Sequence, residues 1–239
     1  MITLYIDVPF ASFRKSFARS YVETYVVPPP ATVYGMLLSL IGEKYRSAHQ
    51  GVRLAFAYRK VPQIVTTLRK LSRYKYGVAS KQQSLGNAPD FIETACGLEF
   101  ICWIDSSQEE NHLNLEQRVK EAILNPDEIS RYGILNLGLS DDLVNEISLI
   151  EEVGGEWNKL ISRSGEIKPI KFLSNDSLKF HKLIPNPSGA IELPIWVDHV
   201  GGQGTVWQRF NLEDIAYFLT IQPGDEWWPW LTIKSNSIK

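Results

Sequence analysis

Apolar and polar residues alternate at the start of the chain, and this pattern returns in several later segments. In residues 2–8 the apolar positions Ile2, Leu4, Ile6 and Val8 are separated by other, mostly more polar residues. A period of two residues is typical of a β-strand with one buried face. The same reasoning predicts further strands at residues 52–59, 98–104, 145–150, 191–197 and 205–210.

Two segments show the helical spacing of apolar residues instead. The first follows three consecutive prolines at 28–30, has apolar residues at 33, 36, 37, 40 and 41, and offers Thr32 as its N-cap. The second covers residues 115–124 and is ended by Asn125 and Pro126. On the first helix a line of small residues favours close packing of the backbone against a neighbour. These residues are Gly35, Ser39 and Gly42.

Over residues 1–150 the elements run strand, helix, strand, strand, helix, strand. That order predicts an α+β fold with a ferredoxin-like domain, the architecture of RNA-recognition domains. Residues 60–97 do not fit this order, because they lie between the second and third strands, where a hairpin connection needs only a few residues. We therefore interpret them as a projecting insertion. Residues 151–239 are expected to form a smaller β-rich C-terminal region, in which residues 201–204 turn between two strands. Its tryptophans at 227, 228 and 230 are expected in the core, with a docking surface as the alternative.

The composition indicates a globular protein. Of 239 residues 44% are hydrophobic and 11% aromatic, which is enough for a sizeable core and too much for a disordered chain. No apolar run approaches the ~18 residues of a membrane-spanning helix, and the first residues lack the pattern of a signal peptide. Cys96 and Cys102 form no CxxC motif, which favours a reducing compartment. We therefore expect a cytoplasmic protein.

The net charge of −2 hides a strong asymmetry along the chain. The first 89 residues carry 13 Lys and Arg against three acids, whereas the remaining 150 carry 12 against 24. Between Lys44 and Pro89 there are ten basic residues and no acid, with tyrosines among them. Positive charge mixed with aromatic rings is typical of a surface that binds single-stranded nucleic acid. The alternative is a solvated basic face without a ligand.

The candidate RNA-binding residues are these basic side chains together with nearby tyrosines and amides. Basic groups bind phosphates, tyrosines stack on bases, and amides both donate and accept, so they can read base edges. Arg53 and Arg59 lie at the two ends of a predicted strand, on a face that we expect to be open to a phosphate backbone. The full set is Arg14, Lys15, Arg19, Arg53, Arg59, Arg69, Lys70, Arg73, Tyr74, Lys75, Tyr76, Lys81, Gln82, Gln83 and Asn87.

Three segments occur in a recognisable order. They are residues 5–14 (YIDVPFASFR), residues 28–42 (PPPATVYGMLLSLIG) and residues 137–140 (LGLS). They resemble the first strand and its loop, the proline-led helix and the Leu-Gly-x-Ser turn of the Cas-five family of RAMP proteins. That family often has Arg where Leu139 stands. The resemblance covers about the first 150 residues, and the tail beyond Glu151 matches no family that we can name.

This resemblance implies a role in CRISPR systems. Members of the family form the foot of Cascade, grip the 5′ handle of the crRNA, cap the backbone filament and contact the large subunit. The resemblance implies that residues 60–97 are the thumb that holds the handle, and it is strongest to myxobacterial-type and transposon-associated variants. The expected partners are crRNA and the other Cascade subunits, with target DNA near its flanking motif as a further option. No membrane and no cofactor are expected.

Catalysis is the main alternative, because some relatives cut repeat RNA with a Tyr, a Lys-His pair and no metal. The nearest acid–base pair here is Asp198 with His199, and His181 with Lys182 is a reversed version of the Lys-His pair. We therefore keep a metal-independent endoribonuclease as the second hypothesis and an α/β enzyme for an anionic metabolite as the third. No Cys/His spacing of a metal site occurs, so we predict no metal site. The four histidines are scattered in the sequence, so we predict no catalytic site either.

Overall fold

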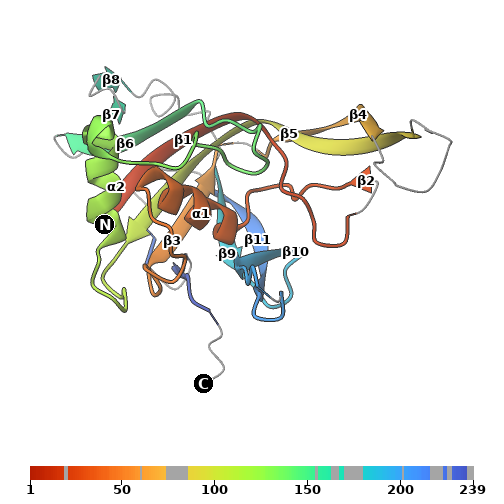
Figure 1. Ribbon diagram of the computed structural model, residues 1–239. Helices are drawn as coiled ribbons and strands as arrows, with labels where there is room; N and C mark the ends of the chain where they lie inside the picture. The colour runs from red at the N-terminus through yellow and green to blue at the C-terminus, as the bar shows by residue number, and fades with distance from the viewer. Residues whose placement is uncertain are drawn as a thin grey trace.

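The computed structural model describes residues 1–18, 21–59, 61–73, 86–153, 156–162, 167–169, 180–200, 202–215, 223–224 and 228–235. Within these ranges the fold is mixed α/β and consists mostly of an antiparallel sheet with two α-helices (Figure 1). The helices are α1 (Pro30–Leu40), α2 (Leu115–Leu124) and the short 3₁₀ helix η1 (Pro126–Glu128). The strands are β1 (Ile2–Ala11), β2 (Tyr21–Val22), β3 (Arg53–Tyr58), β4 (Gln63–Arg73), β5 (Gly86–Asp105), β6 (Glu146–Val153), β7 (Glu156–Ser162), β8 (Ile167–Pro169), β9 (Phe180–Pro185), β10 (Ile191–Trp196), β11 (Val206–Ile215) and β12 (Leu231–Thr232).

The centre of the sheet has the strand order β3-β5-β1-β6, and all neighbours in it are antiparallel. Both helices pack on one face of these strands, where their apolar residues join those of β1, β3 and β5 in one large core cluster (Figure 1). The strands that follow β6 extend the same sheet at both ends. β7 and β8 continue it beyond β6, whereas β9, β11 and β10 continue it beyond β3.

The predicted helices are present, but one predicted cap is wrong. α2 covers the expected residues, and the Asn114 side chain caps it by accepting from the Gln117 backbone N–H at 2.9 Å. α1 begins two residues before Thr32, with Pro29 as its N-cap and no side-chain capping bond. Proline suits the first helical position because its fixed φ is already helical and its missing N–H has no partner there.

The line of small residues on α1 does allow a close approach at its C-terminal end. Gly42 has a φ of 69°, and a Cβ at this position would lie 2.2 Å from the backbone oxygen of Ser130. Gly35 is less constrained, since its Cβ would meet only the Arg46 side chain at 3.4 Å. The expectation of close backbone packing therefore holds at Gly42.

The second face of the sheet is covered, which overturns our expectation for β3. Ala55 and Ala57 point to this face and are 1% and 0% exposed. A second core cluster covers them with residues of β9, β11 and the C-terminal segment, among them Phe180, Ile215 and Trp228. The sequence could not reveal this, because the covering residues lie more than 120 positions away. Trp228 is therefore a core residue and Trp230 is partly buried, whereas Trp227 lies outside the described residues.

The insertion at 60–97 is a long two-stranded ribbon. β4 pairs with the first half of β5 from Gln63↔Cys96 to Arg73↔Gly86, and β2 adds a short parallel pairing to the other edge of β5, midway along the ribbon. β5 is continuous from this ribbon into the central sheet, where its partner on the same side changes from β4 to β3. Figure 1 shows the ribbon extending away from the body of the molecule. The ribbon is thus anchored by a strand that is itself part of the core.

Candidate nucleic-acid interface

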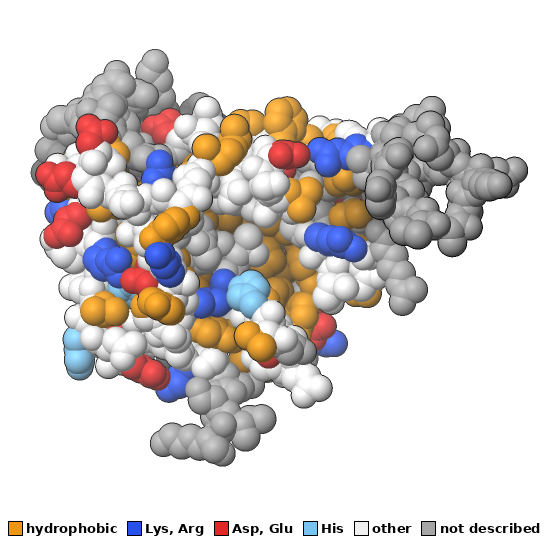
Figure 2. All heavy atoms as spheres, in the orientation of Figure 1, with side chains coloured by type: hydrophobic (Ala, Val, Ile, Leu, Met, Phe, Trp, Pro, Cys, Tyr) orange, Lys and Arg blue, Asp and Glu red, His pale blue; other side chains and the backbone are white. Residues whose placement is uncertain are grey.

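Four segments that are far apart in the sequence meet at the N-terminal end of α1. Together they line a groove of about 450 Å³, and Figure 2 shows the face that carries α1 with a hollow near its middle. Its walls include Ser12 and Arg14 after β1, Thr32 of α1, Gly138 and Leu139 of the 137–140 turn, and Asp198, Thr205 and Trp207 of the β10–β11 hairpin. Three of these segments carry the family resemblance, so motifs that are separate in sequence converge on one place.

A single carboxylate joins two of these segments. Oδ2 of Asp142 accepts the backbone N–H groups of Ser12 and Leu139, each at 2.7 Å. Gly138, which precedes Leu139, has a φ of 119°, and a Cβ at this position would come within 2.6 Å of the same Asp142 oxygen. Burial raises the pKa of Asp142 although both hydrogen bonds oppose that shift. Through Asp142, the Leu-Gly-x-Ser turn thus holds the end of β1 beside the groove.

The β10–β11 connection is also organised by one carboxylate. Asp198 accepts the backbone N–H of Val200 at 2.9 Å and that of Gly204 at 3.2 Å, while its own N–H donates to the Thr205 hydroxyl at 3.1 Å. Such side chain–backbone bonds stabilise a turn. The carboxylate that we considered as a partner for His199 therefore holds the loop beside the groove.

The N-terminus of α1 offers few donors to an anion. Pro29 and Pro30 have no N–H, and the N–H groups of Thr32 and Val33 both donate to the Pro29 carbonyl. A phosphate in this groove would depend on side chains more than on the helix terminus.

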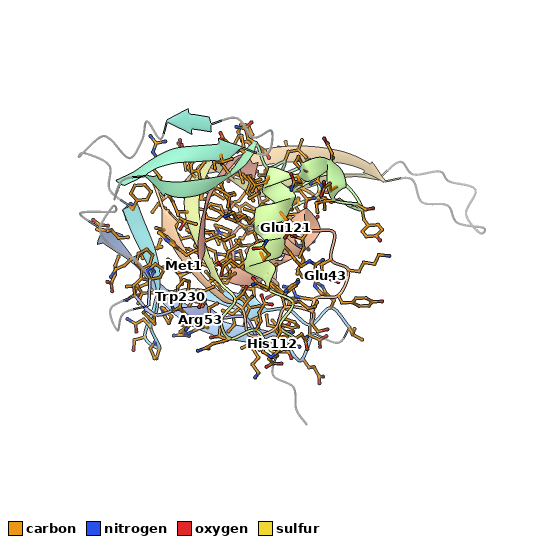
Figure 3. All side chains as sticks on the ribbon, turned by 90° about the vertical axis from the view of Figure 1, so that its left-hand side faces the viewer. Met1, Glu43, Arg53, His112, Glu121 and Trp230 are labelled. Carbon is orange, nitrogen blue, oxygen red and sulfur yellow. The ribbon has the colours of Figure 1, made fainter. Side chains whose placement is uncertain are left out.

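Two of the predicted arginines are held by carboxylates on the sheet. Arg53 donates to Asp105 from both Nε and Nη2, and its guanidinium lies 5.4 Å from the Trp230 ring centroid, as the neighbouring labels in Figure 3 illustrate. Burial alone would raise the pKa of Asp105, but the bonds from Arg53 and Ser107 lower it. Arg59 is bound to Glu99 at the other end of β3. Both cations are thus neutralised within the protein.

The predicted basic residues near the groove differ in their partners. Arg14 lines the groove and donates to the backbone oxygen of Ala18 at 2.6 Å. Lys15 forms an ion pair with Glu23 at 3.0 Å, and Arg69 one with Asp141 at 3.3 Å. The Arg69 pair is exposed on both sides, so solvent screens it and a competing anion can displace it.

The remaining predicted residues belong to the far half of the ribbon or lie beyond the described ranges. Lys70 and Arg73 are in β4, opposite Pro89 and Gly86, and Asn87 is in β5 opposite Ser72. The predicted residues outside the described ranges are Arg19, Tyr74, Lys75, Tyr76, Lys81, Gln82 and Gln83. Among the predicted residues, the structure therefore places Arg69, Lys70, Arg73 and Asn87 on the ribbon and Arg14 at the groove.

The groove has aromatic walls that were not predicted from the sequence. Trp207 is 41% exposed, and Tyr25 lines the same space, where burial raises its pKa. Trp207 lies on the opposite face of its strand from the buried Phe210. The period-two alternation of this strand could therefore have predicted that Trp207 is exposed. Midway along the ribbon Tyr21 stacks on Phe91 with ring centroids 6.2 Å apart. Exposed rings beside a groove are suited to stacking with bases.

The histidines do not form a catalytic group with the expected neighbours. His49 is fully buried between Glu109 and Arg118, and His181 is bound to Asp214 at 2.8 Å. Lys182 is almost fully buried and lies 3.5 Å from Glu213. His199 lines a second, smaller pocket and contacts Arg46 at 3.4 Å. Among the described residues there is no cluster of His, Cys, Asp or Glu that could hold a metal ion.

With this geometry established, comparison with known proteins identifies the family. No family model matches the chain. A curated protein of Myxococcus xanthus (strain DK1622), named "CRISPR-associated protein Cas5", is 35% identical over 223 residues, which cover 93% of this chain and 94% of that protein. The chain belongs to the Cas5 family. The family that the three motifs indicated is thereby confirmed, and the match extends into the tail beyond Glu151, which we could not assign from the sequence.

The fold agrees with this assignment. A solved structure described as "CRISPR RNA-guided surveillance complex" contains a chain that matches with a TM-score of 0.58 at 10% identity, over 90% of each chain. At that level of identity the match concerns the fold alone. It extends past residue 150, so the C-terminal strands belong to the shared fold of this Cas5 protein.

Proposed function

We propose that this Cas5 protein is a non-catalytic RNA-binding subunit of a type I Cascade complex. In this proposal it grips the 5′ handle of the crRNA and caps the backbone filament next to the large subunit. One observation carries the proposal: the segments that mark the family line a single groove beside an extended basic ribbon. Family membership and the structural match to a chain of a CRISPR surveillance complex support it.

The strand order supports a ferredoxin-like core within this proposal. The first, second, third and fourth core strands are β1, β3, β5 and β6, and their spatial order β3-β5-β1-β6 with two helices on one face fits that architecture. We propose residues 1–150 as this domain, residues 60–97 as its thumb and residues 151–239 as a smaller β-rich region.

The RNA path in this proposal runs from the ribbon to the groove. The ribbon supplies Arg69, Lys70, Arg73 and Asn87, and the sequence that joins β4 to β5 contains further basic and aromatic residues. Arg14 and Trp207 continue the surface at the groove. Basic side chains would contact phosphates, and the rings would stack on splayed bases. Arg53 and Arg59 contact the RNA in this proposal only if an RNA phosphate displaces the carboxylates that bind them, Asp105 and Glu99.

One finding concerns membranes. The α-helices in the described part of the chain are each too short to cross a membrane. We propose that the protein acts in the cytoplasm, since a guide-RNA complex assembles where its RNA is made.

The test begins with the protein purified together with its native partner subunits, followed by sequencing of the RNA that accompanies it. We expect RNAs that share one repeat-derived 5′ end. Random fragments, or an intact assembly without RNA, would contradict the proposal.

The segment between β4 and β5 gives a sharper prediction. Replacing Lys75→Ala together with Tyr76→Ala removes a cation and a stacking ring, and we expect handle affinity to fall about tenfold or more, as measured by filter binding. Lys120→Ala on α2 removes the same charge away from the ribbon and is the matched control. Unchanged handle affinity in the double variant would remove the ribbon from the RNA path.

An endoribonuclease remains the second candidate because of one pocket. Lys44, Tyr132 and His199 line the same cavity of about 280 Å³, and these are the residue types that the alternative requires. Without a metal, a base would take the proton of the RNA 2′-hydroxyl, whose oxygen would attack the adjacent phosphorus. The bond to the 5′-oxygen would break as an acid protonates that oxygen, which gives a 2′,3′-cyclic phosphate and a free 5′-hydroxyl. Cleavage of repeat RNA in the presence of EDTA, abolished by His199→Ala, would establish this function. We expect the RNA to remain intact.

A further inference from the structure

Helix α1 is buried on all sides except along one line of small residues. Its positions that are not fully buried are Thr32, Gly35 and Ser39, and Gly42 continues the line just beyond the helix. Thr32 lines the groove, whereas the other three line the second pocket. At 1.5 Å per residue the line from Thr32 to Gly42 is about 15 Å long. The two pockets thus lie one after the other along the same side of α1, where Gly35, Ser39 and Gly42 have small side chains or none.

The second pocket contains a guanidinium with no counter-charge. Arg46 donates to the Ala31 carbonyl at 2.7 Å and lies against Tyr34 and Trp196, with its central carbon 5.5 and 5.4 Å from their ring centroids. Its Nε is buried and has no hydrogen-bond partner among the described residues. Within the same residues Arg53, Arg59 and Arg118 each bind a carboxylate, and Arg46 binds none. Burial also lowers the pKa of Arg46, consistent with an uncompensated charge.

Two further groups complete the pocket. Lys44 lies over the ring of Tyr132, with Nζ 4.5 Å from the centroid, and no carboxylate is within ion-pair distance of it in the described structure. His199 accepts from Arg46 through Nε2 at 3.4 Å, because a guanidinium can only donate, so the neutral ring carries its proton on Nδ1. Glu43 also lines the pocket, but Arg118 binds its carboxylate at 2.8 Å. The pocket therefore has an excess of positive charge and of donors.

A partly buried guanidinium with no counter-charge and an unsatisfied Nε is costly, and an anion that fits the cavity removes that cost. From this we infer that Arg46, Lys44 and His199 form a phosphate-binding pocket, which takes a backbone phosphate of the RNA strand that leaves the groove along α1. The identity of the strand rests on the proposed function, whereas the phosphate site rests on the charges and the cavity alone. Gly35 and Ser39 keep the floor low enough for the strand to pass, and Tyr132 offers a ring beside it.

The test compares the full-length protein with a double variant, Lys44→Ala with His199→Ala. Both side chains are at the surface of the pocket, so the variant keeps the packing of Arg46 on Tyr34 and Trp196. We expect the affinity for single-stranded repeat RNA to fall about tenfold, and the log–log salt slope to decrease by about 0.7, the value of one phosphate contact on a single strand. His112→Ala with Lys120→Ala changes the same residue types outside both pockets and should leave both quantities unchanged.

A second variant tests the floor independently of charge. Ser39→Leu places a bulky side chain on the exposed line of α1, where leucine also favours the helix. We expect the same loss of RNA affinity with no loss of folding stability.

Inorganic phosphate distinguishes the source of the anion. If phosphate binds the wild type and not the double variant while the RNA slope is unchanged, the site holds a free phosphate-bearing ligand and the strand path is wrong. If neither phosphate binding nor the RNA slope changes, the inference is overturned. A loss of RNA binding in Lys75→Ala/Tyr76→Ala but not in the pocket variants would retain the proposed function and reject the pocket.

Discussion

At the residue scale, several charged or titratable side chains that are conspicuous in the sequence are paired with one another within the protein. His49 illustrates this: its Nε2 accepts from Arg118 at 2.9 Å, so its proton lies on Nδ1, which donates to Glu109 at 3.1 Å. Arg118 in turn binds Glu43. The network joins the end of α1, the segment after β5 and α2. We therefore assign His49 a structural role, which its isolated position in the sequence did not reveal.

This network predicts how stability depends on pH. The hydrogen bond from Arg118 holds the pKa of Glu43 below its usual 4.5. The unfolded state thus binds a proton more readily, and the contribution of Glu43 is present above pH 4.5 and lost as pH falls through the folded-state pKa. We expect Glu43→Gln to lose about 1 kcal/mol at pH 7 and the difference from wild type to vanish toward pH 3. Urea midpoints across this range measure it.

The exposed Asp127 in η1 provides the control for this experiment. Asp127→Asn removes a carboxylate for which the described structure contains no ion pair, so its stability curve should follow the wild type at every pH. A constant offset for Glu43→Gln from pH 7 to pH 3 would contradict the linkage.

At the scale of single elements, α1 offers a pair of glycines with opposite predicted effects. Gly42→Ala forces a Cβ onto the Ser130 carbonyl at a φ of 69°, and we expect a loss of more than about 2 kcal/mol. Gly35→Ala lies in the helix interior and meets only an arginine side chain, so we expect a gain of up to about 1 kcal/mol. Chemical denaturation compares the two directly. Equal effects would refute the close approach at Gly42.

Both helices and half of the described strands were predictable, because local patterning fixes their type, whereas β2, β4, β7, β8, β9 and β12 were not predicted. The six predicted strands and both helices occur, and α2 has the predicted bounds. The ribbon was not predicted as strands, because apolar and polar residues do not alternate regularly along β4. Within the described residues, β4 pairs only with the first half of β5. Pairing between two strands of one hairpin does not require the regular alternation that a half-buried strand shows.

At the scale of the whole molecule, the sequence could not indicate where distant segments meet. The groove joins positions near residues 14, 32, 138 and 205, and no local pattern links Ser12 to Asp142. The face of β3 that we expected to be open is closed by segments from beyond residue 179. Closure of that face leaves the groove on the α1 side and the ribbon as the surfaces available to RNA in our proposal.

This closure leads to a last prediction, which separates folding from binding. Trp228 is fully buried and packs edge-to-face on Trp103, with ring centroids 4.9 Å apart. Trp228→Ala should therefore cost about 3–5 kcal/mol of folding free energy in thermal or urea unfolding, since it removes a large side chain from a closed core. Trp207→Ala, on the groove wall, should leave stability nearly unchanged and weaken RNA binding by the loss of one stacking ring. If Trp228→Ala were tolerated while Trp207→Ala unfolded the protein, the second face would be the open one, and the RNA path would have to be placed there.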